Sequence, residues 1–441
     1  MTYALILLIL VVIVALLFEY INGFHDAANA IATVVSTKVL SPRYALLYAA
    51  VLNFFGAFFG THVAKTIGAG IVDQAAVTQE VIICALIGAI IWNLLTWLFG
   101  IPSSSSHALI GGLVGAAIAH SGFEVLYFNG LINKVVIPMF ASPFIGFIIG
   151  FSVMLLLLWI CAKSAPERIN KRFKSLQLFS AGVMAFSHGS NDAQKVMGII
   201  TLSLITGGLL GTATFKVQDD EKKGSNTMPA NVCQLSRPKN FKSTEGTDTS
   251  LTLEWEAVEN ASCYIIEYKK TSETAWIQTT FSDTTAKLEG ITRGIYYDLR
   301  IRATGDNDSV DPSDWATIRA KSLGFVVPVW VIFICAVTMG FGTMAGGWKI
   351  IRTMGKRVIE LKPIHGFAAE TTAASTILTA SFFGIPVSTT HIISTAIMGV
   401  GSTIRFSAVK WGLVGNIVLA WFLTIPVCAV FSSVLYELFV P

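Results

Sequence analysis

Long apolar runs with at most one charged residue recur along this chain, separated by short polar segments. Examples cover residues 5–18, 81–99, 144–160 and 409–435, and their lengths approach or exceed the roughly 20 residues that an α-helix needs to cross a bilayer. Only 13% of all residues are charged, against about 25% in soluble domains. The pattern predicts an all-α membrane protein that crosses the bilayer several times.

The pattern changes between residues 216 and 322, where almost half of the Lys and Arg residues lie and no run is apolar enough to cross a membrane. Short alternating runs there, such as 251–255 and 297–302, predict β-strands and a small all-β sandwich. Residues 236–322 resemble a fibronectin type III domain, which implies either a module that binds an extracytoplasmic protein or a tolerated insertion. Cys233 and Cys263 lie in this region and would pair only in an oxidising compartment.

Two polar phrases occur twice in the apolar part of the chain. Gly-x-x-Asp-Ala stands at residues 23–27 and 189–193, and Gly-Ile-Pro-x-Ser-x-x-His at 100–107 and 384–391. The Asp and the Pro are 76 positions apart in the first copy and 88 in the second once residues 216–321 are left out. Because polar groups are costly at membrane depth, a duplicated polar motif predicts a transporter whose site lies between two structural repeats.

Basic residues predict how the two halves are oriented. Outside the insert, most of them lie at 38–43, 163–174, 349–362 and 405–410, and short basic loops favour the cytoplasm. The chain path that satisfies all four segments makes the same moves from opposite sides of the membrane. It therefore predicts two inverted repeats with broken helices and re-entrant helical hairpins, and it places the insert and both termini outside the cytoplasm.

This path gives an expected organisation of the whole chain. The predicted parts are membrane repeat 1 (1–162), a basic cytoplasmic linker (163–175), the first part of repeat 2 (176–215), the soluble insert (216–322) and the second part of repeat 2 (323–441).

The second phrase has the chemistry of an anion site. Pro102 and Pro386 end one helix, and the Ser and Thr residues that follow favour the start of another, whose N-terminus offers free N–H groups and partial positive charge. Two such ends facing one another would hold one small anion, whereas ordinary helix capping is the alternative. His107 and His391 follow the hydroxyl residues, and we expect them to donate to backbone carbonyls rather than to sense pH.

The first phrase has the chemistry of a cation site. Gly23 and Gly189 are expected to let the helix break beside Asp26 and Asp192, and carboxylate, amide and carbonyl oxygens suit Na⁺ or a proton relay. The alternative is a structural Asp paired with a neighbour such as Lys195, which either neutralises Asp192 or binds the anion. Two glutamates are further candidates. Glu370 suits an ion ligand or a proton carrier, and for Glu19 snorkelling to the interface is the alternative.

The four linked phrases resemble those of the inorganic phosphate transporter (PiT) family of cation–phosphate symporters. The resemblance implies uptake of inorganic phosphate with Na⁺ by alternating access, by a homodimer in the inner membrane. The alternative is uptake of phosphate, or of a metal–phosphate complex, with H⁺. Sulfate permeases in the same family leave sulfate open. Asn53 stands where the animal members have a glutamate, and Lys195 where many members have Asn; both changes make the site less negative, which leaves the cation open. A membrane hydrolase is disfavoured because adjacent Ser and His cannot easily form a nucleophile–base hydrogen bond, and no nucleic-acid partner is expected.

These arguments give two sets of candidate ligands. The expected phosphate ligands are Ser104, Ser105, Ser106, Ser388, Thr389, Thr390, Asn29, Gln194 and Lys195, and the expected Na⁺ ligands are Asp26, Asp192, Asn29, Asn191 and Glu370.

Overall fold

The computed structural model describes residues 3–74, 77–210, 235–246, 250–291, 295–305, 312–321, 325–357 and 359–440. The chain forms a helical unit, Met1–Gly207 with Val327–Pro441, and a second unit, Gly208–Val326. Cys233 lies outside the described residues, and Cys263 has a free thiol.

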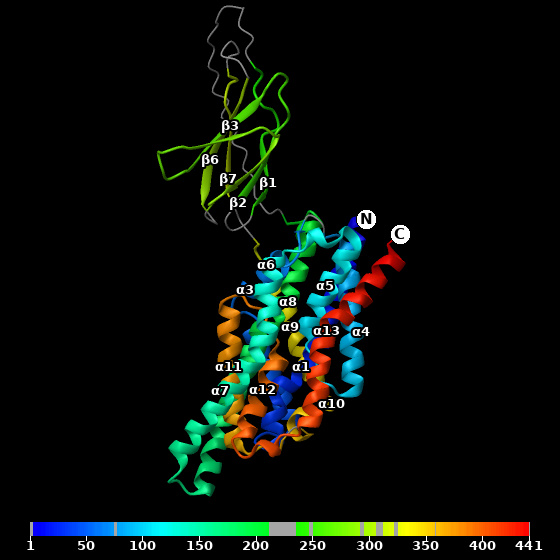
Figure 1. Cartoon of the computed structure of the whole chain (residues 1–441), viewed down its shortest axis with the longest axis vertical. Coiled ribbons are helices and arrows are strands. Elements are labelled where there is room, and N and C mark those ends of the chain that lie inside the picture. Colours follow the sequence, from blue (N-terminus) through cyan, green and yellow to red (C-terminus); the bar gives the residue numbers. More distant parts are fainter. Residues whose placement is uncertain are drawn as a thin grey trace, which may run out of the picture. The chain divides into compact units, whose positions relative to one another are not determined.

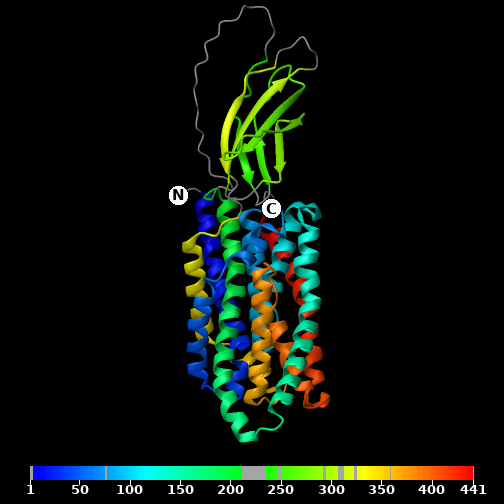
Figure 2. The ribbon, with the colours of Figure 1, turned by 90° about the vertical axis from the view of Figure 1, so that its left-hand side faces the viewer.

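The helical unit is built from two successive sets of helices (Figures 1 and 2). The first set is α1 (Tyr3–Ser36), α2 (Pro42–Gly56), α3 (His62–Ala69), α4 (Gln79–Phe99), α5 (Ser105–Ser121), α6 (Phe128–Leu131) and α7 (Ile137–Cys161). The second set is α8 (Pro166–Thr206), α9 (Val329–Ala345), α10 (Trp348–Arg352), α11 (Pro363–Phe382), α12 (Thr389–Ser402) and α13 (Trp411–Phe439). Short π-helices at Ile132–Val136 and Thr353–Arg357 lead into α7 and follow α10.

Several of these helices have the length and composition of membrane spans. Among the described residues there are four such spans, Tyr3–Ser36, Gln79–Phe99, Phe128–Cys161 and Trp411–Phe439, or five if the pair α9 and α10, bent by 60°, is one span. Their outer faces carry large exposed apolar side chains, such as Trp159 at 77% and Val329 at 78%. Because water disfavours such a surface, it fits the hydrocarbon of a bilayer, and the prediction of a mostly helical membrane protein is confirmed.

The two sets of helices pack reciprocally. α5 lies against α13 and α12 against α7, while α2 lies against α8 and α9 against α1. α1 and α8 run in opposite directions (Figure 1). Thr37, at the far end of α1, donates to Gln177 near the start of α8 with an O–O distance of 2.9 Å. Helices of each half therefore pack against helices of the other half.

The helix breaks do not lie where the glycines of the first phrase predict them. α1 and α8 run unbroken through Gly23 and Gly189, so that prediction was wrong. These glycines instead permit close helix packing: a Cβ on Gly23 would lie 2.9 Å from the Gly342 Cα, and one on Gly189 would overlap the Asn53 carbonyl oxygen. The predicted linker at 163–175 is also helical from Pro166 onward, because α8 begins there.

The breaks lie instead at the second phrase. Gly100 ends α4 with φ of 67°, and the corresponding Gly384 follows α11 with φ of 65°. This left-handed conformation favours glycine. Pro102 and Pro386 follow within the short extended segments that lead to α5 and α12. Each hairpin thus has its break directly before a Ser/Thr-rich helix N-terminus.

The second unit is an antiparallel β-structure with two sheets. In its described residues one sheet has the order β1 (Lys242–Gly246), β2 (Ser250–Glu254), β5 (Thr285–Glu289), and the other β4 (Ile277–Phe281), β3 (Cys263–Lys270), β6 (Tyr296–Thr304), β7 (Ala316–Lys321). Alternate side chains, such as Leu299 and Ile301, are buried in a shared core with Trp255. The predicted small antiparallel insert is confirmed.

Candidate ion and anion site

The N-termini of α5 and α12 are capped in the same way. The Ser104 hydroxyl accepts a hydrogen bond from the His107 backbone N–H at 3.2 Å, and the Ser388 hydroxyl accepts one from the His391 N–H at 3.2 Å. These caps satisfy one free N–H group each, and the hydroxyls beside them remain available to side chains or a ligand. The sequence prediction of a new helix after each proline is confirmed.

The hydroxyl cluster of the second half meets polar residues of both long helices. Asn29 of α1 donates from Nδ2 to the hydroxyls of Thr389 at 3.1 Å and Thr390 at 2.9 Å. Thr389 in turn donates to Asp192 Oδ2 of α8 at 3.0 Å, and Thr390 lies 3.5 Å from Asp26 Oδ1. The structure thus brings together predicted site residues that are up to 364 positions apart.

Lys195 joins the first half of the site to the second. Its Nζ donates to Asp192 Oδ1, to the Ser106 hydroxyl, and to the Val387 carbonyl oxygen at 3.1 Å. The side chain is almost completely buried, and a buried charge needs such partners. Lys195 therefore neutralises Asp192, as one of the two alternatives predicted, and it also holds a positive charge beside the hydroxyls.

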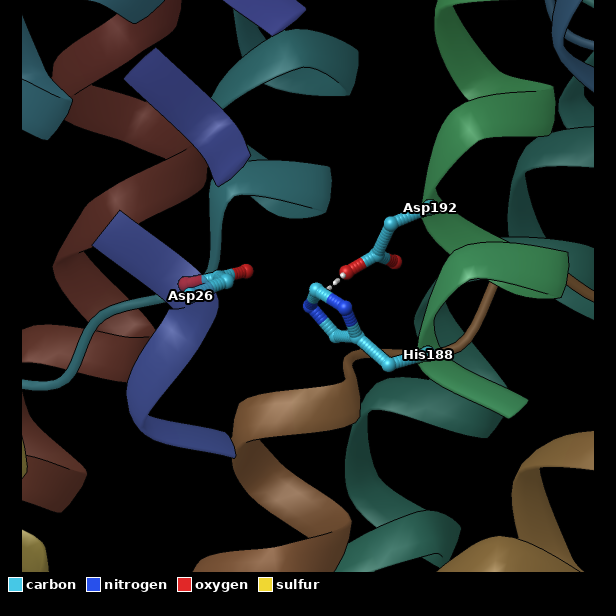
Figure 3. A group of neighbouring side chains, drawn as sticks. All are labelled: Asp26, His188 and Asp192. Atoms are coloured by element: carbon cyan, nitrogen blue, oxygen red, sulfur yellow. Dashed lines mark ion pairs between the residues drawn. The ribbon is translucent and has the colours of Figure 1, made fainter. Parts of the chain in front are cut away.

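Two carboxylates and one imidazole lie close together in the site (Figure 3). One ligand atom each from Asp26, His188 and Asp192 lies within 4.8 Å of the other two, and all three side chains are buried. His188 Nε2 is 3.0 Å from Asp192 Oδ2. His25 Nδ1 is 2.7 Å from Asp26 Oδ1, so each carboxylate has its own histidine.

Neither of these histidines is among the predicted site residues. His188 stands four positions before Asp192, and residues at this spacing on a helix are neighbours, so the i, i+4 pair was a usable signal. His25 is directly before Asp26 in the chain, and adjacent helical residues point in different directions. Only the structure shows that its ring turns back to the carboxylate, with Nε2 held 3.1 Å from the Thr96 hydroxyl.

Two predicted site residues lie outside the cluster. The side chain of Gln194 holds the turn before α3: Oε1 accepts from the Val63 N–H at 2.9 Å, and Nε2 donates to the Phe59 carbonyl at 3.2 Å. Its role as a phosphate ligand stays a prediction, and in this structure its side-chain amide bonds to the backbone instead. Glu370 accepts hydrogen bonds from Thr33, Ser180 and Gln177, and Thr33 is seven residues, about 10 Å along α1, from Asp26.

Two other predicted residues keep polar atoms without partners. Asn191 donates from Nδ2 to the Ser381 hydroxyl at 2.7 Å, but its Oδ1 has no partner among the described residues. The buried Ser105 hydroxyl likewise has none within the described part of the chain. Because buried polar atoms are normally satisfied, both are suited to contact a ligand.

The histidines after the two hydroxyl clusters contact one another. The ring centroids of His107 and His391 are 4.8 Å apart, and His391 also stacks on Trp421 at 4.1 Å. Neither ring nitrogen of His391 has a hydrogen-bond partner among the described residues, so for this residue the predicted bond to a carbonyl was wrong. The pair packs the two helix N-termini together.

The charges of the site favour cations. Asp26 and Asp192 contribute two negative charges and Lys195 one positive charge when the histidines are neutral, which leaves one net negative charge in a buried space. A bound anion would add to that charge, and burial of uncompensated charge is costly. The arrangement is therefore suited to bind an anion only together with cations.

The model of one protein family, described as the phosphate transporter family, matches residues 22–432. The chain belongs to the phosphate transporter family. It is a membrane transporter and not an enzyme. The motif-based resemblance to phosphate transporters is thereby confirmed.

The sequences of individual relatives match this family member along nearly its whole length. A protein of Rhizobium meliloti named as a probable low-affinity inorganic phosphate transporter is 37% identical over 99% of this chain and 97% of its own. A protein of Bacillus subtilis with the same name is 36% identical over 99% of this chain and 98% of its own.

A solved structure shares the fold of this family member. It is titled as the sodium-dependent phosphate transporter, and it matches with a TM-score of 0.67 and 20% identity over 98% of both chains. At this identity the likeness concerns the fold alone.

Proposed function

We propose that this protein takes up inorganic phosphate together with Na⁺, by alternating access. The observation that carries the proposal is the convergence of two capped helix N-termini, one from each half, on Asn29, Lys195 and a pair of carboxylates. Helix N-termini with clustered hydroxyls are suited to phosphate. The relatives named above as phosphate transporters support the same substrate.

In this proposal phosphate lies between the N-termini of α5 and α12. Lys195 supplies a charge-assisted hydrogen bond, and the hydroxyls of Ser105, Ser106, Thr389 and Thr390 supply neutral donors. Asn29 donates to both threonine hydroxyls, so it orients them. The hydroxyls of Ser104 and Ser388 accept hydrogen bonds in the helix caps, and each keeps its own O–H group to donate to phosphate.

The coupling cation is proposed to lie between Asp26 and Asp192, with Asn191 Oδ1 as a further oxygen ligand. Two carboxylates within 4.8 Å attract a cation strongly, and hard oxygen ligands favour Na⁺. H⁺ is the second candidate, and one observation favours it: His25 and His188 each contact one of the carboxylates, and an imidazole side chain can take up and pass on a proton.

Alternating access requires two arrangements of the helices around one site, and we propose that inverted repeats supply them. The opposite directions of α1 and α8, the matching glycine breaks and the reciprocal packing of the two halves support this symmetry. The repeats would cover residues 1–162 and 176–441 without the insert. The basic segments support the proposal that the termini and the insert lie outside the cytoplasm of an inner-membrane protein.

For the insert we propose a fibronectin type III-like domain. The strand orders β1-β2-β5 and β4-β3-β6-β7 in two antiparallel sheets support this interpretation. As a domain with a hydrophobic core of its own, it suits binding of an extracytoplasmic protein or spacing. The proposed assembly is a homodimer, which chemical crosslinking in membranes would test.

The test is transport by the purified full chain in proteoliposomes. Phosphate uptake driven by an inward Na⁺ gradient, and not by an inward pH gradient of equal size, is the expected result. Uptake driven only by the pH gradient would show that the coupling ion is H⁺ and not Na⁺. Uptake abolished by excess sulfate, with sulfate itself transported, would overturn phosphate as the substrate.

A further inference from the structure

The ligand pattern of the proposed cation site occurs a second time in α1. Asp26 and Asn29 are a carboxylate and an amide three positions apart, and Glu19 and Asn22 form the same pair seven positions earlier. Seven residues are about two helical turns, so the pairs lie on nearly the same face of α1, about 10 Å apart along its axis. The second pair lies on the side of the N-terminus.

The second pair is buried as completely as the first. Glu19 is 0% exposed and Asn22 is 3% exposed, so the alternative, in which Glu19 snorkels to an interface, was wrong. A carboxylate this deep is retained at high cost unless a partner compensates it. Its position is therefore not explained by packing alone.

The polar atoms of the pair are mostly unused. Asn22 Nδ2 lies 3.5 Å from Glu19 Oε2, a long hydrogen bond, while Glu19 Oε1 and Asn22 Oδ1 have no partner among the described residues. Both free atoms are oxygens. Buried oxygens without hydrogen-bond donors are suited to coordinate a cation, because a cation accepts electron density from each of them.

A third buried residue with free polar atoms lies on the neighbouring helix. Asn93 of α4 is 0% exposed, and neither side-chain atom has a partner within the described residues. It lies one turn before Thr96, whose hydroxyl contacts His25 of α1. α4 packs against α1, and thus offers a further amide oxygen on the side of α1 that carries these residues.

We propose that Glu19 and Asn22 form a second Na⁺ site, with Asn93 as a further candidate ligand, occupied before or together with the site at Asp26 and Asp192. This proposal rests on the proposed function. A carboxylate and amide oxygens supply one negative charge and neutral oxygens, which match a monovalent hard cation. An ion bound here would lie about two turns of α1 before Asp26. The site is therefore suited to hold a Na⁺ ion before it moves on to the site at Asp26 and Asp192.

The experiment measures phosphate uptake by the full chain in proteoliposomes as a function of external Na⁺. Loss of a residue that only hydrogen-bonds to a metal ligand lowers metal affinity by about 10- to 100-fold. Glu19→Gln changes a proposed ligand itself, so it is expected to raise the half-saturating Na⁺ concentration at least about tenfold. The Hill coefficient for Na⁺ should fall toward one, and the phosphate KM at saturating Na⁺ should stay unchanged. Asn22→Ala should act in the same direction with a smaller shift, and it replaces Glu19→Gln if that variant does not fold.

The matched control is Tyr20→Phe, at the next position of α1, whose side chain is exposed; it should retain the wild-type Na⁺ curve. Wild-type Na⁺ curves in both Glu19→Gln and Asn22→Ala would overturn the second site. A shift of the pH profile in place of the Na⁺ curve would overturn Na⁺ as its occupant. Wild-type uptake that does not depend on Na⁺ at all is a different result: it removes the proposed coupling ion before any variant is compared.

Discussion

Replacing Lys195 by Gln removes the positive charge that lies between the hydroxyl cluster and the carboxylates. In the structure Nζ contacts Asp192 Oδ1, Ser106 Oγ and the Val387 carbonyl. We expect two effects of opposite sign, weaker phosphate binding and stronger Na⁺ binding. If Lys195 were only structural, its replacement would not weaken phosphate binding and strengthen Na⁺ binding at the same time.

The magnitudes follow from the contacts. A hydrogen bond from a charged group contributes about 1.5–3 kcal/mol, which corresponds to a phosphate KM raised by about 10- to 100-fold at about 1.4 kcal/mol per factor of ten. A Na⁺ ion held by Asp192 would lie roughly 5 Å from Nζ, and at an effective dielectric constant near 20 the repulsion is about 3 kcal/mol. The half-saturating Na⁺ concentration should therefore fall by up to about 100-fold.

The assay is initial phosphate uptake in proteoliposomes, titrated first with phosphate and then with Na⁺. Lys195→Arg keeps the charge and should retain most of the phosphate affinity. Lys134→Gln removes a half-buried lysine outside the site, which donates to the Phe383 carbonyl at 3.2 Å, and should resemble the wild type. A Lys195→Gln protein that folds, with both constants within about a factor of two of the wild type (under about 0.5 kcal/mol), would refute the placement of phosphate beside this lysine.

Three further outcomes are expected. Asp26→Asn and Asp192→Asn should each abolish cation-coupled uptake while the protein still inserts; wild-type uptake by either variant, with insertion checked by size-exclusion chromatography, contradicts the ion site. Gly189→Ala should destabilise the helical unit by about 1–3 kcal/mol, because its Cβ would overlap the Asn53 carbonyl oxygen, and thermal unfolding in detergent measures this against Gly415→Ala, which has open space around it. Replacement of residues 216–322 by a short Gly/Ser linker should leave phosphate KM and Na⁺ dependence unchanged in the uptake assay, and a changed KM would assign the insert a part in transport.

The apolar runs and the repeated phrases were enough to predict the helices and the capped helix starts. Each of these features depends on local chemistry: an apolar run long enough for a bilayer, a proline that ends a helix, and a serine that caps the next one. The alternation of the insert likewise predicted its strands. For the same reason the hydroxyl residues of the site could be named from the sequence alone.

The sequence could not determine what Gly23 and Gly189 do. A glycine at membrane depth either lets a helix break or lets another backbone approach, and both uses look the same in a sequence. Here the neighbouring helices lie directly against these positions, and α1 and α8 stay continuous. Only the neighbours decide between the two uses.

The partners of the polar side chains were also decided by the tertiary structure. Gln194 was grouped with the site because it stands beside Lys195 in the chain, but its side chain points to the turn before α3. His188 was overlooked, yet its ring lies between the carboxylates of two helices. The sequence alone determined which polar residues are available at membrane depth. The packing of helices from both halves determined which of them meet, because a side chain's partners depend on which neighbouring helix its side of the helix faces.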